Sequence, residues 1–169
     1  MTRRFAVKKE IRILGLDFCN PRRQVGAVVR GGHYLDGIVV FPARPIPQNR
    51  AIASAILRTR FFPELRLIMV HHTRHRLDAK VIEKLTKLPV VEVASANKRA
   101  SNGFESYKIG SKKSQIASSL PSETLQEILS TTWLTGTLPE PLRIAHLVSR
   151  SRIFSGKRRV SKPTNKFAF

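Results

Sequence analysis

The chain has 169 residues, of which 41% are hydrophobic, and these values are those of one globular domain with a hydrophobic core. Its single cysteine, Cys19, excludes an internal disulfide and any zinc site built from several thiolates. The sequence contains no run of about 18 apolar residues that would cross a bilayer, so we expect no membrane partner and a cytoplasmic location.

The net charge indicates a polyanionic partner. Lysine and arginine number 31 against 11 acidic residues, which gives a formal charge of +20 and an isoelectric point near 11.5. Solubility requires far less charge than this. Each phosphate that a cation neutralises releases condensed counterions, so nucleic acid matches such a protein better than the alternative, an anionic membrane surface.

The N-terminal part of the chain predicts three antiparallel strands that follow a basic arm. Residues 1–10 form the arm, and an apolar strand should follow at 11–17. Residues 25–30 and 34–41 are rich in β-branched side chains and flank Gly31-Gly32-His33, which is typical of a hairpin. We therefore expect three consecutive strands joined by tight turns.

The middle of the chain predicts alternating helices and strands. Prolines at 42, 45 and 47 should end the antiparallel sheet. We then expect a helix over 48–60, a buried strand over 65–70, a helix with Leu77, Val81, Leu85 and Leu88 on one face, and a strand over 89–93. Strand, helix and strand in this order imply a parallel pair with a right-handed crossover.

The C-terminal third predicts a long basic loop, two helices and a basic tail. Residues 95–118 are rich in Ser, Asn, Gly and Lys, which is typical of a loop. One helix should contain Leu125, Ile128 and Leu129, and another should begin near Pro139 and pack through Ile144, Leu147 and Val148. Residues 150–169 form the tail, so the folded domain should span 11–149.

Several motifs together resemble one known family, the archaeal endonuclease V-like proteins of unknown function, which have a ribonuclease H-like fold. The resemblance covers roughly residues 11–149 and is most specific near the C-terminus. Its motifs are Leu14-Gly15-Leu16-Asp17, Val28-Val29-Arg30-Gly31-Gly32, Leu35-Asp36-Gly37, Leu88-Pro89-Val90, Thr131-Thr132, Gly136 and Leu138-Pro139-Glu140-Pro141-Leu142-Arg143-Ile144-Ala145-His146-Leu147. The fold that it implies is a mixed α/β sheet with three antiparallel N-terminal strands, flanked by helices and carrying basic terminal tails.

The resemblance also implies a nuclease site that this chain has lost. Relatives of endonuclease V hold magnesium with clustered carboxylates, and Asp17 occupies the position of the first-strand carboxylate. The acid expected after the strand at 65–70 is replaced by His71-His72, and the acidic segment after the third strand is replaced by Pro42-Ala43-Arg44-Pro45. We therefore expect an inactive nuclease with Asp17 as a vestige, no metal and no cofactor. The alternative is a metal-dependent endonuclease that acts on RNA or deaminated DNA.

For the other candidate residues we favour roles other than catalysis or metal binding. His71, His72 and His75 have metal-ligand chemistry, but an exposed basic turn that contacts phosphate together with Arg74 and Arg76 explains them better. Asp17 should pair with an arginine. Cys19 and His146 should be packing residues of the core.

The sequence therefore predicts an RNA-binding structural component of a ribonucleoprotein. The ribosome is the candidate assembly, with rRNA and neighbouring ribosomal proteins as partners, and a DNA-coating or repair accessory protein is a further alternative. Phosphate contacts are expected from Arg3, Arg4, Lys8, Lys9, Arg74, Arg76, Lys98, Arg99, Lys112, Lys113, Arg150, Arg152, Lys157, Arg158, Arg159, Lys162 and Lys166.

Overall fold

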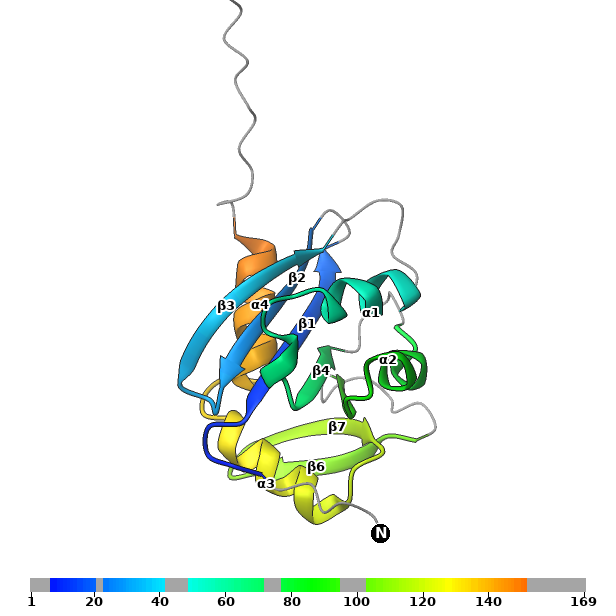
Figure 1. Ribbon diagram of the computed structural model, residues 1–169. Helices are drawn as coiled ribbons and strands as arrows, with labels where there is room; N and C mark the ends of the chain where they lie inside the picture. The colour runs from blue at the N-terminus through cyan, green and yellow to red at the C-terminus, as the bar shows by residue number, and fades with distance from the viewer. Residues whose placement is uncertain (1–6, 21–22, 42–48, 72–76, 95–102, 152–169) are drawn as a thin grey trace, which may run out of the picture.

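The computed structural model describes residues 7–20, 23–41, 49–71, 77–94 and 103–151. These residues form a seven-stranded sheet of order β3-β2-β1-β4-β5-β7-β6 with helices on both faces (Figure 1). The predicted mixed α/β class, with three antiparallel strands at the N-terminal end, is confirmed. Both predicted tails fall mostly outside the described residues.

The three N-terminal strands form an antiparallel meander. Strands β1 (Arg12–Asn20), β2 (Arg23–Arg30) and β3 (Tyr34–Phe41) pair in chain order, as predicted. The turn between β2 and β3 needs glycine because Gly31 has φ 63°, a left-handed conformation that a side chain disfavours. Its N–H donates a hydrogen bond of 2.8 Å to the carbonyl oxygen of Ile11, which ties the turn to the start of β1.

Strands β4 (Leu67–His71) and β5 (Val90–Ala94) extend the sheet in parallel with β1. Helix α1 (Asn49–Leu57) and the short 3-10 helix η1 (Phe62–Glu64) precede β4, and α2 (Ala79–Thr86) connects β4 to β5. The predicted strand, helix and strand order is therefore confirmed.

The inner face predicted for α2 was only partly right, because Leu77 and Leu88, just outside the helix ends, pack against the core but the helix buries other residues. Its buried residues are Ile82 and Thr86, whereas Leu85 is 39% exposed. The helix begins only after Asp78, whose side chain accepts a hydrogen bond from the Val81 N–H as an N-cap. The buried face therefore lies one residue further along the chain than the pattern of leucines indicated.

Most of the long loop predicted over 95–118 is a β-hairpin. Strands β6 (Glu105–Ile109) and β7 (Lys112–Ser118) pair with each other, and β7 also pairs with β5. Only one face of this hairpin packs on the core, through Tyr107, Ser114 and Ile116. Polar residues therefore occupy much of the hairpin, and composition alone indicated a loop. Residues 95–102 lie outside the described ranges.

Helices α3 (Ser122–Thr132) and α4 (Glu140–Arg150) confirm the two C-terminal helices, but the packing face of α4 was predicted only in part, because Ile144 packs against the core and Leu147 does not. Leu147 is 54% exposed, and the buried side chains include Leu142, Ala145 and Ser149. Ala145 and Ser149 have small side chains, which suit this face because α4 approaches β1 closely. Hydrophobicity alone favoured the larger residues on the neighbouring face.

The helices cover the sheet in two layers. Helices α1 and α2 form one core with side chains of β1, β2 and β4, and α3 and the start of α4 form the other core with the opposite face (Figure 1). Side chains of β1 alternate between the two faces of the sheet, and they are buried on both faces because helices cover both. None of the helices in the described part of the chain is long and apolar enough to cross a membrane.

Candidate functional site

Three side chains from distant parts of the chain meet at one end of the sheet. Alternate positions of β1 face α3 and α4, and these are Ile13, Gly15 and Asp17. The corresponding positions of β4 are Leu67, Met69 and His71. The parallel register pairs Leu16 with Val70, so Asp17 and His71 lie side by side one residue further along. We call this end of the sheet, marked by Asp17, His71 and Ala94, the carboxyl edge.

Helix α4 brings the third side chain to the same point. It lies so close to β1 that a Cβ on Gly15 would stand 2.3 Å from the carbonyl carbon and oxygen of Pro141. From this contact the helix runs toward the carboxyl edge, where His146 and Ser149 lie one turn apart beside Asp17. The absence of a side chain at Gly15 therefore sets the position of His146.

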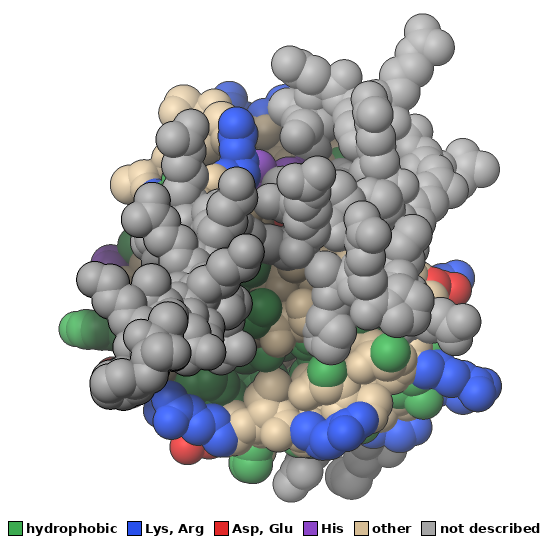
Figure 2. Space-filling model, turned by 90° about the horizontal axis from the view of Figure 1, so that it is seen from above, with side chains coloured by type: hydrophobic (Ala, Val, Ile, Leu, Met, Phe, Trp, Pro, Cys, Tyr) green, Lys and Arg blue, Asp and Glu red, His purple; other side chains and the backbone are tan. Residues whose placement is uncertain are grey.

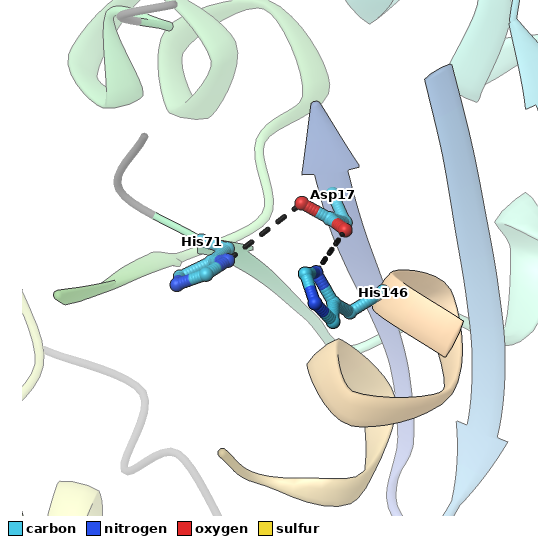
Figure 3. Close-up of side chains that lie close together, drawn as sticks. All are labelled: Asp17, His71 and His146. Atoms are coloured by element: carbon cyan, nitrogen blue, oxygen red, sulfur yellow. Dashed lines mark hydrogen bonds and ion pairs between the residues drawn. The ribbon is translucent and has the colours of Figure 1, made fainter. Parts of the chain in front are cut away.

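The carboxylate of Asp17 lies between the two histidines (Figure 3). Its Oδ2 is 2.8 Å from Nδ1 of His146 and accepts a hydrogen bond of 3.0 Å from the Ser149 hydroxyl. Its Oδ1 is 3.6 Å from Nδ1 of His71. The imidazole rings meet edge to face with centroids 6.0 Å apart. Asp17 is fully buried, while the side chains of His71 and His146 are 12% and 27% exposed.

The Nδ1 atom of His71 has no hydrogen-bond partner although solvent does not reach it. The 3.6 Å that separates it from Asp17 Oδ1 is short enough for an ion pair but too long for a hydrogen bond. Buried polar atoms in proteins are nearly always paired, and exceptions concentrate at functional sites. His71 Nδ1 is therefore an unpaired buried polar atom beside the Asp17 carboxylate.

An ion pair within the first turn of α4 joins Glu140 and Arg143, and Thr135 connects this turn to the preceding loop. Arg143 donates two hydrogen bonds to Glu140 Oε2, of 2.9 and 2.6 Å, and the Thr135 hydroxyl donates one of 2.7 Å to Oε1. Burial alone would raise the pKa of Glu140, but these hydrogen bonds and the charge of Arg143 together lower the pKa below its ordinary value. The hydrogen bond that Arg143 donates to Glu140 raises the pKa of Arg143.

Segments rich in positive charge begin around this site. Four strands end at the carboxyl edge, namely β1, β3, β4 and β5, and helix α4 ends there too. Strand β2 begins at the same edge. Residues 21–22, 42–48, 72–76, 95–102 and 152–169 adjoin these ends. They hold 12 of the 31 lysines and arginines and none of the 11 acidic residues: Arg22, Arg44, Arg74, Arg76, Lys98, Arg99, Arg152, Lys157, Arg158, Arg159, Lys162 and Lys166.

Figure 2 looks onto this end of the molecule. Where described side chains are visible, histidine appears near the centre, lysine and arginine gather around the rim, and few acidic side chains are seen. The exposed Arg150, in the last turn of α4, also belongs to this end. The carboxyl edge therefore combines a buried acid and two histidines with a basic surrounding sequence.

The structure separates other residues that the sequence grouped with these as phosphate contacts. Lys8 and Lys9 are exposed beside the turn at Gly31, at the opposite edge of the sheet. Lys113, by contrast, is exposed near the start of β7, two residues before Gln115, which pairs with Ala94 at the carboxyl edge. Lys112 has a structural partner, because its Nζ donates hydrogen bonds of 2.6 and 2.7 Å to the carbonyl oxygens of Trp133 and Leu134. The other predicted contacts, Arg3, Arg4, Arg74, Arg76, Lys98, Arg99, Arg152, Lys157, Arg158, Arg159, Lys162 and Lys166, lie outside the described residues.

The grouping of Asp17 with His146 was not foreseen from the sequence. The sequence predicted an arginine beside Asp17, whereas the partners described for it are His71, His146 and Ser149. His146 was expected to be a core residue, but its side chain is partly exposed. The signal was present in the spacing of His146 and Ser149, which places both on one face of α4. The side chain of Cys19, and His72 and His75, lie outside the described part of the chain.

The described residues define a mixed α/β protein with a buried carboxylate and two histidines at the carboxyl edge of its sheet. The chain is similar to archaeal proteins named UPF0215. The chain is 28% identical to a UPF0215 protein of Methanosarcina mazei, over 86% of this chain and 92% of that protein. It is 27% identical to one of Methanopyrus kandleri, over 85% and 91% of the two chains. No profile of a known protein family matches the sequence.

Two solved structures share the fold. A protein of unknown function from Archaeoglobus fulgidus superposes with a TM-score of 0.64 at 23% identity, over 82% of this chain and 96% of that one. Argonaute of Marinitoga piezophila, solved in complex with a 5′ OH guide RNA, superposes with a TM-score of 0.53 at 14% identity, over 85% of this chain and 30% of that one. At these identities the likeness concerns the fold alone.

Proposed function

We propose that the protein binds the backbone of RNA at the carboxyl edge and acts as a noncatalytic component of a ribonucleoprotein, derived from an endonuclease V-like nuclease. One observation carries the proposal: five segments that begin at this edge hold 12 basic residues and no acidic one. The other basic residues are interspersed with all 11 acids. A solvated surface chosen only for solubility would mix the two signs of charge.

The covalent chain itself keeps part of this charge near the site. One residue spans at most about 3.6 Å, so the Cα atoms of Arg74 and His71, three residues apart, lie within about 11 Å of each other. The same limit applies to Arg152 and Ser149. Cations at this distance around a partly exposed site suit a phosphate chain that passes over it. The likeness in fold to an Argonaute solved with a guide RNA also supports a nucleic-acid partner.

RNA is preferred over duplex DNA because of the composition of the basic segments. Short basic segments that alternate with Ser, Gly and Pro can follow an irregular RNA surface, as extensions of ribosomal proteins would. The ribosome is the candidate assembly, with rRNA and neighbouring ribosomal proteins as partners. Sedimentation of the native protein with a ribosomal subunit at moderate salt would support this assembly, and sedimentation as the free protein would exclude it.

Salt dependence tests the binding surface. A variant with Lys157, Arg158 and Arg159 replaced by glutamine should lose about two units from the slope of log affinity against log salt, since each phosphate contact contributes roughly 0.7–0.9. A control variant replaces Arg66, Lys84 and Lys87, which are exposed near the start of β4 and the end of α2, at the opposite edge. Both variants lose the same charge.

The slope measured with a structured RNA should fall only in the first variant. Equal losses in both would show that charge is recognised without regard to the carboxyl edge, and the proposal would be wrong. Competition by duplex DNA at matched salt distinguishes RNA binding from the DNA-coating alternative. Tighter binding of the DNA would favour that alternative.

A second candidate function, phosphodiester cleavage, is favoured by the position of Asp17 in the middle of this edge. Its substrate would be RNA or deaminated DNA. Cleavage by the wild-type protein with added divalent ions, lost in Asp17→Asn and retained in His33→Gln, would establish it. If the wild-type protein cleaved no faster than Asp17→Asn, cleavage would be excluded and binding would remain the proposed function.

A further inference from the structure

We propose that Asp17, His71 and His146 form a binding site for one transition-metal dication, of which Zn²⁺ is the representative. The three residues each place a ligand atom within 4.8 Å of the other two. The sequence predicted no metal, and the expected magnesium ligands were carboxylates. The inference therefore concerns a different donor set, and it stands independently of RNA binding.

The donor set selects the class of metal. Two imidazole nitrogens and one carboxylate oxygen are ligands for zinc, iron, cobalt or nickel, whereas Mg²⁺ takes oxygen ligands and keeps several waters. Three protein ligands are also the number found in zinc sites that keep a position open for water or substrate. His146, 27% exposed, provides the open side of the cluster.

The distance between Asp17 and His71 fits an intervening ion. With bonds of about 2.1 Å to each atom, the measured 3.6 Å between Oδ1 and Nδ1 corresponds to an angle of about 120° at the metal. This lies close to tetrahedral geometry. The ion would also supply the missing partner of the buried Nδ1 of His71.

His146 must move to complete the set. Ligand atoms of a tetrahedral site with bonds of about 2.1 Å lie about 3.4 Å apart, so the separations of up to 4.8 Å must close by about 1.4 Å. Rotation of the partly exposed imidazole provides this. The Ser149 hydroxyl donates to Oδ2 and leaves Oδ1 toward His71, which is how residues behind metal ligands usually orient a carboxylate.

Metal binding to the full-length protein tests the site. The protein is freed of nucleic acid with nuclease and high salt, then titrated with Zn²⁺, Co²⁺ or Mg²⁺ alone in a calorimeter. We expect one Zn²⁺ per chain, a visible absorption band with Co²⁺ and no competition from millimolar Mg²⁺. His146→Gln and His71→Gln should each weaken Zn²⁺ binding by more than the roughly 10–100-fold that loss of an outer partner costs.

Two control variants test whether Zn²⁺ binds at the proposed site or at other histidines. His33→Gln removes an exposed imidazole at the turn between β2 and β3 and should leave Zn²⁺ affinity unchanged. A double His72→Gln, His75→Gln variant tests whether the adjacent histidines bind the metal instead. Loss of Zn²⁺ in that variant together with retention in His146→Gln would overturn the inference, as would equal affinity of all variants.

Folding and RNA binding are measured on the same samples. Glutamine at 146 can still donate a hydrogen bond to Asp17, so circular dichroism and thermal unfolding should show a folded His146→Gln variant. Its affinity for RNA in the presence of a chelator should equal that of the wild type, because the basic segments are intact. Zn²⁺ binding without RNA binding would uphold the metal site and refute the proposed function.

Discussion

Replacement of Gly15 by alanine tests whether the close approach of α4 to β1 positions the site. The new Cβ would lie 2.3 Å from the carbonyl carbon and oxygen of Pro141 and 2.8 Å from the nitrogen of Leu142. Carbon atoms in contact are ordinarily about 3.5–4.0 Å apart. Because all three clashing atoms belong to the backbone of α4, the helix must move away by about 1 Å or more.

The cost of this movement can be estimated. Overpacking a core costs about 1–3 kcal/mol, and a clash with backbone belongs at the upper end of that range. Lower entropy of the unfolded chain returns about 0.4–1 kcal/mol when glycine becomes alanine. The free energy of unfolding should therefore fall by about 2 kcal/mol, which corresponds to a decrease in Tm of about 4–8 °C for a domain of this size.

Urea unfolding of the nucleic-acid-free protein measures the effect, with Gly26→Ala as the matched control. Gly26 lies on β2 opposite Leu16, and its added Cβ would meet only side-chain atoms of Leu14, Leu16 and Phe41 at 2.9–3.1 Å. Those side chains can move, so the control should lose less than about 1 kcal/mol. If Gly15→Ala were as stable as Gly26→Ala, the contact would not determine where α4 lies.

Two further substitutions test interactions that hold α4 and the β6–β7 hairpin in place. Glu140→Gln should lower the free energy of unfolding at pH 7 by about 1.5–3 kcal/mol, because the hydrogen bonds to Arg143 lose their charge. The pKa of Glu140 is lowered in the folded state, so its contribution to the free energy of unfolding is present above the unfolded pKa near 4.3 and is lost as pH falls through the folded pKa. The difference in unfolding free energy between wild type and Glu140→Gln should therefore be smaller at about pH 3 than at pH 7. Lys112→Met should cost about 1–3 kcal/mol because the carbonyls of Trp133 and Leu134 lose their donor, whereas Lys113→Met, at an exposed neighbour, should change stability by less than about 0.5 kcal/mol. Equal stability of the two lysine variants would contradict a structural role for Lys112.

The elements that the sequence predicted well are those with a strong local signal. Gly31-Gly32-His33 between two β-branched runs is sufficient to specify the hairpin, and β3 was predicted with its observed bounds. Strands β6 and β7 were missed because one of their faces is solvated. The buried face of α4 was predicted only in part because the close contact at Gly15 selects small residues such as Ala145, which a search for large apolar residues passes over.

The site could be predicted only in part, since its geometry is tertiary. Alternation along a strand places Asp17 and His71 at strand ends, but their adjacency depends on the register between β1 and β4. His146 is 129 residues from Asp17 in sequence, and nothing local links them. The resemblance to endonuclease V-like proteins directed attention to missing acids, whereas the structure places two imidazoles beside the remaining one.

The basic segments and the cluster of Asp17, His71 and His146 affect each other electrostatically. Cations that begin at the carboxyl edge raise the free energy of placing a dication beside Asp17, which offers a single negative charge. Phosphate groups of the proposed RNA partner would reverse this by neutralising the cations, and phosphate oxygens are also metal ligands. A metal ion and an RNA backbone should therefore each increase the affinity for the other by the same factor, since coupling between two binding sites is reciprocal. On this argument the proposed metal site needs no further acidic ligand from the protein, because the proposed anionic partner would supply the additional negative charge.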